Sequence, residues 1–327
     1  MIENSKLGYR KHVLDEFEFG TGQVLQNIEV EYTTRGTPEY DEDGNVSNAV
    51  IFCHAFDGDC LSIADLENLI GSGGELYSFN FFYISITSLG YPKSCSPSTT
   101  GLKFDFPEYT FKDCVNFKRK LLAEVFNIKN VLGIFGTGIG GYETYTWACE
   151  YPDEMEFAII ANSSFKTSNY RYIISKTLNT VLDSSYFYQD HGHNEHLSSI
   201  MLSIYSIIYS QYFSKTKLED YSRYELDLFM DNFVEEGLFV DTYDFKYRND
   251  ALLHYDVEDK LSNIKAKILV VGTSGDIYYS PKLDIYPLED KIEHVETYVF
   301  NGEEHLFNYD YSKFADIFKK FLKEVKK

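Results

Sequence analysis

The segment GIFGTGIGGYETYTWACEYPD, residues 133–153, has the order of a nucleophile elbow: a short apolar strand, a tight turn of small residues, and then a helix. In the elbow pattern G-x-S-x-G, serine occupies the apex of a strained turn between strand and helix. Residues 136–140 read GTGIG, so Gly138 stands at the apex and carries no hydroxyl group. The sequence therefore predicts the turn that presents a nucleophile, without the nucleophile itself.

An acid and a histidine follow the elbow in the chain order of a hydrolytic triad. Asp276 lies in VVGTSGDIYYSP just beyond an apolar run at 266–272, and His305 lies in NGEEHLFNYD just beyond a run at 295–302. A histidine acts as a general base when a carboxylate holds its ring in the correct tautomer. We therefore expect Asp276 and His305 to lie together beside Gly138.

Other hydroxyl and thiol groups could replace the missing nucleophile. Thr137 precedes the apex, and strand alternation points its side chain away from the position of Gly138. Glycine at the apex relieves backbone strain of about 1–3 kcal/mol while it removes the covalent chemistry. The remaining candidates lie on other loops or strands: Cys53, Cys60, Ser163 and Ser164.

The elements that must position these groups follow an alternation of apolar strand-like runs and helical patterns, typical of an α/β protein with a mostly parallel sheet. We expect the first two strands to form an antiparallel hairpin across the turn-rich segment RGTPEYDEDGNVS. Thr110 and Asp113 form a capping-box pattern at the start of a crossover helix. The predicted strands are 24–34, 48–56, 79–86, 130–136, 157–163, 266–272 and 295–302, and the predicted helices include 110–127 and 311–325.

The segment 165–257 breaks this alternation, because it has helical periodicity and no strong strand. We interpret it as a helical lid inserted into a core formed by residues 1–164 and 258–327. Within it, DHGHNEH holds His191, His193 and His196, which could bind a metal. The spacing matches no familiar metal site, so a polar loop between lid helices is the simpler interpretation, and we expect no metal.

Composition excludes several classes of function. The 327 residues are 44% hydrophobic, enough for one large core, or for one core plus an inserted subdomain. The formal net charge of −21 repels nucleic acid and anionic membrane surfaces. Five cysteines without C-x-x-C spacing indicate neither a disulfide framework nor a zinc ribbon. With no apolar leader or membrane-length run, we expect a cytoplasmic protein whose partner is a small molecule.

Several motifs outside the lid are found together in one family. They are YTTRGT at 32–37, NAV at 48–50, HAFDGD at 54–59, Gly90, SPS at 96–98, FP at 106–107, GTGIGG at 136–141 and WACEYPD at 147–153. In these motifs the chain resembles the homoserine O-acetyltransferases of the α/β-hydrolase superfamily. The resemblance implies an α/β-hydrolase fold, a mostly parallel sheet flanked by helices, with an inserted helical lid.

The resemblance also implies roles for individual residues. Gly138 would occupy the nucleophile position, with Asp276 and His305 as its triad partners, and the backbone N–H groups of Phe56 and Ile139 would form the oxyanion hole. It further implies a ligand pocket under the lid, a homodimer formed through the lid, and acetyl-CoA as the acyl donor. No tightly bound cofactor is implied.

This chain departs from the family at two places. The apex serine, which passes an acetyl group from acetyl-CoA to the homoserine hydroxyl in that family, is absent. Leu306 follows His305 where the family has an aspartate suited to the substrate's ammonium group, and Glu303 or Glu304 could replace that charge.

Two hypotheses of function follow. In the first, the chain is a pseudoenzyme, a fold kept as a ligand-binding or regulatory module. The N-myc downstream-regulated proteins, which have this fold without the catalytic apparatus, show that the architecture can serve without a triad. In the second, His305 and Asp276 activate a water or an acceptor hydroxyl for direct acyl transfer or thioester hydrolysis.

Overall fold

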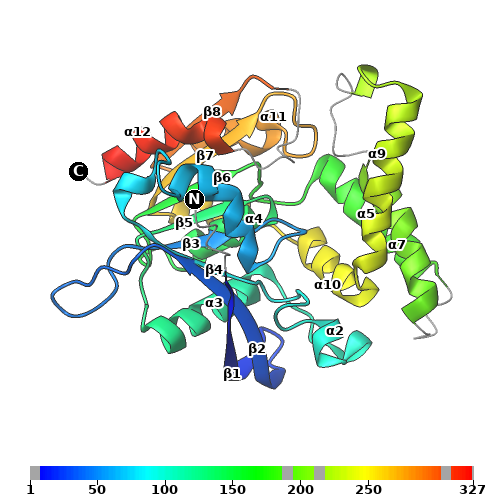
Figure 1. Cartoon of the computed structure of the whole chain (residues 1–327), viewed down its shortest axis with the longest axis horizontal. Helices are drawn as coiled ribbons and strands as arrows, with labels where there is room; N and C mark the ends of the chain where they lie inside the picture. The colour runs from blue at the N-terminus through cyan, green and yellow to red at the C-terminus, as the bar shows by residue number, and fades with distance from the viewer. Residues whose placement is uncertain (1–7, 186–193, 210–217, 303–310, 326–327) are drawn as a thin grey trace, which may run out of the picture.

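The computed structural model describes residues 8–185, 194–209, 218–302 and 311–325 of the chain (Figure 1). Its centre is an eight-stranded sheet in the order β1-β2-β4-β3-β5-β6-β7-β8. The strands are β1 Arg10–Glu18, β2 Val24–Arg35, β3 Ala49–Cys53, β4 Phe82–Ile86, β5 Gly133–Thr137, β6 Phe157–Ala161, β7 Lys267–Thr273 and β8 Val295–Phe300. β2 is antiparallel to β1 and β4, and all the other neighbouring pairs are parallel.

Helices connect the parallel strands and cover both faces of the sheet (Figure 1). They are α1 Glu67–Ile70, α2 Pro97–Thr100, α3 Phe111–Phe126, α4 Ile139–Glu150, α5 Asn169–Asp183, α7 Asn194–Tyr209, α9 Arg223–Glu236, α10 Thr242–Leu253, α11 Pro281–Asp284 and α12 Ala315–Val325. The capping box between Thr110 and Asp113 opens α3, which confirms that prediction. The predicted α/β fold with a mostly parallel sheet is also confirmed.

The alternation of side chains along β3 shows how the two faces are filled. Ile51 and Cys53 belong to a cluster that includes α3 and α4, whereas Val50 and Phe52 belong to a cluster that includes α12. Because successive strand residues point to opposite faces, a central strand covered on both sides is apolar throughout. All five residues of β3 are buried.

The predicted hairpin between strands 24–34 and 48–56 was wrong. β2 pairs with β1 and with β4, while β3 lies between β4 and β5. The sequence analysis overlooked β1, because seven of its nine residues are exposed or half-buried and only Leu14 and Phe17 face the core. This strand reaches its partner through the short connection at 19–23, where Gly22 has φ +83°.

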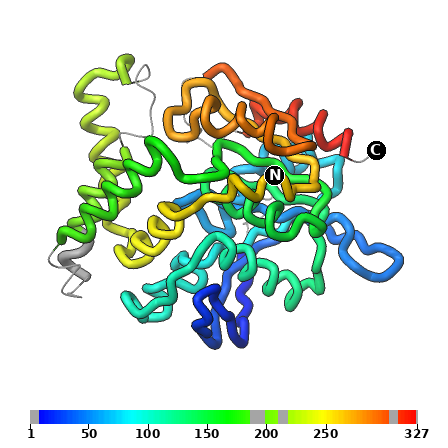
Figure 2. The backbone as a smooth tube through the Cα atoms, turned by 180° about the vertical axis from the view of Figure 1, so that it is seen from behind, coloured from blue at the N-terminus to red at the C-terminus, as the bar shows by residue number. Residues whose placement is uncertain are grey.

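Among the described residues between β6 and β7 there are four helices, α5, α7, α9 and α10, within the segment 165–257 assigned above to a lid. Figures 1 and 2 show α5, α7 and α9 standing together to one side of the sheet. Side chains of α5, α7 and α10 form an apolar cluster, which includes Leu178, Met201, Ile204 and Phe245. We call these four the lid helices; that they form a separate unit with the predicted boundaries stays a prediction. Across the described ranges, no helix is long and apolar enough to cross a membrane.

Candidate active site

The turn at Gly138 joins β5 directly to α4, with no other residue between them. Gly138 has φ +54° and ψ −123°, a combination that residues with a side chain adopt only under strain. Its amide donates to the Ala161 carbonyl at 3.2 Å, and its carbonyl accepts from the Gly141 amide at 3.1 Å. The backbone therefore has the strained strand-to-helix form that a nucleophile elbow requires.

The glycines around the elbow are there for different reasons. A Cβ atom would lie 2.2 Å from Thr144 Oγ1 at Gly136 and 2.0 Å from the Cys53 carbonyl oxygen at Gly140. At Gly138 the nearest atom to such a Cβ would be the Ala55 Cβ, at an ordinary contact distance of 3.4 Å. Close packing of helix on strand thus requires Gly136 and Gly140, whereas the apex has room for a side chain and opposes one only through its φ.

Two backbone amides flank this apex. Phe56 lies in the loop after β3, and among the described residues its N–H donates no hydrogen bond. Ile139 is the first residue of α4, where amides have no acceptor inside the helix and the helix dipole is positive. Ala55, next to Phe56, is the residue that faces the apex. That these two amides together receive an oxyanion beside Gly138 stays a prediction.

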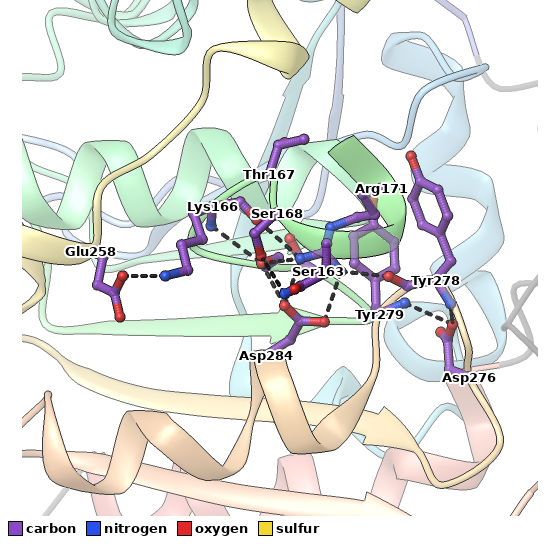
Figure 3. Close-up of polar contacts among 12 residues, drawn as sticks. Ser163, Lys166, Thr167, Ser168, Arg171, Glu258, Asp276, Tyr278, Tyr279 and Asp284 are labelled. Carbon is purple, nitrogen blue, oxygen red and sulfur yellow. Dashed lines mark hydrogen bonds and ion pairs between the residues drawn. The ribbon is translucent and has the colours of Figure 1, made fainter. Parts of the chain in front are cut away.

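Asp276, placed in the loop after β7, is held rigidly. It is buried, and its Oδ1 accepts hydrogen bonds of 2.8 Å from the amides of both Tyr278 and Tyr279 (Figure 3). Its Oδ2 accepts from Asn162 Nδ2 at 3.0 Å. The next residue, Ser163, donates from Oγ to the Gly138 carbonyl at 2.6 Å. The pair 162–163 therefore joins the Asp276 loop to the elbow at the same edge of the sheet.

His305 and its neighbours Glu303, Glu304 and Leu306 lie outside the described residues. The segment that leads to them is fixed beside Asp276, since the Gly275 amide donates to the Gly302 carbonyl at 2.7 Å. The position of His305 relative to Asp276 and Gly138 thus stays a prediction.

Four groups considered above as substitute nucleophiles are sequestered. Burial raises the pKa of Cys53 to about 12 and that of Cys60 to about 11, so both thiols are protonated at neutral pH. The Ser163 hydroxyl donates its hydrogen bond to the Gly138 carbonyl oxygen. The Ser164 hydroxyl donates to Asp284 Oδ1 at 2.7 Å and accepts from Arg171.

Arg171 and Asp284 form a buried salt bridge between lid and core, which we call the Arg171–Asp284 clasp (Figure 3). From α5, Arg171 donates through Nη1 to Asp284 Oδ2 at 2.8 Å and through Nη2 to Oδ1 at 2.7 Å. It also donates to the carbonyl of Tyr278, whose amide binds Asp276. Burial raises the pKa of Asp284, although the hydrogen bond and charge of Arg171 act in the opposite direction. The first lid helix is thereby tied to the loop that holds Asp276.

A second arginine covers the Phe56 loop from α10. The Arg248 guanidinium carbon lies 5.0 Å from the ring centre of Phe56 and 4.4 Å from that of Tyr91. Phe245, also in α10, packs edge-on against Phe56 at 5.6 Å. Helix α10 thus covers the loop that carries Phe56. Neither arginine was predicted as a site residue, because Asp284 and Phe56 lie more than a hundred residues from them in the chain.

No group of His, Cys, Asp and Glu side chains within the described part of the chain could hold a metal ion. Of the histidine cluster, His191 and His193 lie outside the described residues, and only the backbone of His196 is described, in α7.

Comparison with known proteins gives the chain close relatives. A probable acyltransferase from Methanothermobacter thermautotrophicus is 36% identical over 323 residues, which cover 98% of this chain and 99% of that protein. A homoserine O-acetyltransferase from Methanohalobium evestigatum is 27% identical over 308 residues, which cover 82% of this chain and 62% of that protein. No protein-family model matches the chain.

Among solved structures, a homoserine O-acetyltransferase from Bacillus anthracis superposes with a TM-score of 0.82 at 19% identity, covering 97% of each chain. At this level of identity the likeness concerns the fold alone.

Proposed function

Because the chain belongs to the homoserine O-acetyltransferase-like acyltransferases of the α/β-hydrolase superfamily, we propose that it binds an acyl compound at the elbow without forming an acyl-enzyme. The observation that carries this proposal is Gly138, which has the elbow backbone and room for a side chain but no hydroxyl. In this proposal the acyl carbonyl oxygen points to the amides of Phe56 and Ile139, and the acyl carbon lies over Gly138.

The ligand in this proposal is a small molecule held under the lid helices, with acetyl-CoA as the candidate acyl donor. Covalent relay through an acylated serine would split acyl transfer into two steps, and Gly138 cannot perform it. The site would then act as a binding module that keeps the oxyanion donors of its family.

A second candidate function is direct acyl transfer, favoured by the three hydrogen bonds that hold Asp276. In it, His305 takes the proton of a water or an acceptor hydroxyl while that oxygen attacks the thioester carbon. The oxyanion rests on the amides of Phe56 and Ile139, and its collapse expels the CoA thiolate, which takes the proton from His305. Enzymes without their nucleophile retain roughly 10³–10⁴-fold catalysis over water.

Intact-mass spectrometry after incubation with acetyl-CoA tests the first proposal. We expect no acetyl adduct, because no apex hydroxyl can be acylated. A stoichiometric adduct on a pocket residue would contradict the proposal and identify a substitute nucleophile. Release of free thiol that disappears in His305→Ala would instead support direct transfer.

A further inference from the structure

A buried polar network lies beneath the loop that carries Phe56. Lys118 of α3 and Glu143 of α4 form an ion pair in which neither side chain is more than 2% exposed. Ser88, which follows β4, accepts from Lys118 Nζ at 2.6 Å and donates to Glu143 Oε1 at 2.5 Å. The backbone N–H of the same Ser88 donates to His54 Nε2 at 3.1 Å. The ion pair is thus connected to His54, two residues before Phe56.

The hydrogen bonds of His54 define its tautomer. Since Nε2 accepts from a backbone N–H, it cannot carry a proton. The proton must then be on Nδ1, which lies 2.9 Å from the Ala55 carbonyl oxygen and donates to it. A doubly protonated ring would set two donors, Nε2–H and the Ser88 N–H, against each other.

The electrostatic environment of His54 also favours the neutral form of its ring. Burial first, and then the Lys118 ammonium, lowers the pKa of His54 to about 4, while Glu143 and Asp59 act against the shift. Tyr91 packs edge-on against the imidazole, with ring centres 4.7 Å apart. His54 is therefore neutral across the physiological pH range.

The Nδ1–H bond sets the direction of one peptide group. The Ala55 carbonyl accepts from His54 Nδ1 and from the Gly58 amide at 3.1 Å. In a trans peptide the C=O and the following N–H point in opposite directions. Fixing the Ala55 carbonyl towards His54 therefore turns the Phe56 N–H away from it, and Ala55 lies against the apex glycine.

We propose that His54 is a positioning residue, which holds the Phe56 amide towards the elbow through its Nδ1–H bond to the Ala55 carbonyl, with Lys118, Glu143 and Ser88 fixing its tautomer. This inference rests on the proposed function only for the use of that amide as an oxyanion donor. A buried ion pair often adds nothing to stability compared with apolar residues of the same volume. The stability of the fold therefore does not by itself explain the Lys118–Glu143 pair, whereas a role in fixing the loop that carries Phe56 does.

Nitrogen-15 NMR of the His54 imidazole in the natural chain tests the tautomer, and this measurement does not depend on enzymatic activity. We expect a neutral ring with Nδ1 protonated from pH 8 to about pH 5.5, and no titration near the ordinary histidine value of about 6.5. Titration near that value, or a proton on Nε2, would overturn the proposal.

Two matched variants separate positioning from packing. In His54→Asn the side-chain amide can still donate to the Ala55 carbonyl, whereas in His54→Gln the longer side chain can still accept from the Ser88 N–H. With Gly138 unchanged, we expect the amide resonance of Phe56 to keep its chemical shift in the His54→Asn variant. We expect that resonance to shift in the His54→Gln variant. Equal shifts in both variants would overturn the proposal.

Esterase kinetics in the Gly138→Ser background extend the comparison. We expect His54→Asn to keep kcat within about threefold and His54→Gln to lose roughly 10–100-fold at unchanged KM, since a single oxyanion donor contributes about 10²–10³ in kcat. Equal losses that follow thermal stability would indicate packing alone and overturn the proposal. An inert Gly138→Ser chain would count against the proposed function, and the NMR results would then decide on His54.

Discussion

At the scale of single residues, the glycines of the elbow occur for two different reasons. Gly140 is required because any side chain would meet the backbone of β3, with a Cβ 2.0 Å from the Cys53 carbonyl oxygen. Gly138 meets no such obstacle, and its substitution costs only the strain of a positive φ. The apex therefore has room for a side chain, and its glycine supplies no hydroxyl.

We therefore expect Gly140→Ala to destabilise the fold more than Gly138→Ala. The first change overpacks a backbone contact, which we place at about 3 kcal/mol or more. The second adds strain of about 1–3 kcal/mol. Urea denaturation of both variants measures the difference in free energy of unfolding. An equal or larger loss in Gly138→Ala would show that the apex is as crowded as its neighbour.

Among the site residues, those in local motifs could be predicted from the sequence. The elbow at Gly138 and the loop of Asp276 follow apolar strands directly, and the structure places both at the carboxyl edge of the sheet. The partners of Arg171 and Lys118 could not be predicted, because Asp284 is 113 residues from the first and Glu143 is 25 residues from the second. Charge pairing across elements leaves no periodic signal in a sequence.

At the scale of elements, apolar strands were predicted where burial on both faces makes them continuous runs. The edge strand β1 was overlooked because only Leu14 and Phe17 face the core, and the pairing of β2 was therefore assigned to the wrong neighbour. An edge strand exposed to water carries a weaker apolar pattern than a central one.

The docking of α5 on the core depends on the Arg171–Asp284 clasp. We expect Arg171→Met to cost about 3–5 kcal/mol in free energy of unfolding, because it leaves the buried Asp284 carboxylate without its cation. The double variant Arg171→Met with Asp284→Asn should recover part of this loss.

The exposed pair Lys265–Asp153 provides the control for the clasp. Its side chains are 64% and 79% exposed, so Lys265→Met should cost under about 1 kcal/mol. Chemical denaturation measures both effects, and limited proteolysis shows whether the lid helices become accessible. A loss in Arg171→Met no larger than that in Lys265→Met would contradict the assignment of the clasp.

At the scale of the whole molecule, the lid helices and the short turn after them present large apolar side chains to water. Ile173 of α5, Tyr224 of α9 and Phe239, which precedes α10, are 59%, 76% and 89% exposed. Exposed large apolar side chains suit a surface that another protein covers. The family resemblance implies a homodimer formed through this part of the chain.

We expect sedimentation velocity to show a dimer, and the double variant Tyr224→Glu with Phe239→Glu to raise its dissociation constant at least about tenfold by burying charge in the interface. Tyr40→Glu is the matched control, since Tyr40 is 64% exposed in the connection between β2 and β3. A natural chain that stays monomeric at all concentrations would contradict this expectation, as would an equal effect of Tyr40→Glu.

The central claim, that the elbow keeps its form and lacks the nucleophile, is tested most directly by Gly138→Ser with Gly138→Ala as its control. Both variants carry the same backbone strain, and only the serine supplies a hydroxyl at the apex. We expect Gly138→Ser to hydrolyse p-nitrophenyl acetate at least about 100-fold faster than the natural chain, while Gly138→Ala stays at the level of the natural chain. A folded Gly138→Ser chain no more active than Gly138→Ala would contradict the claim.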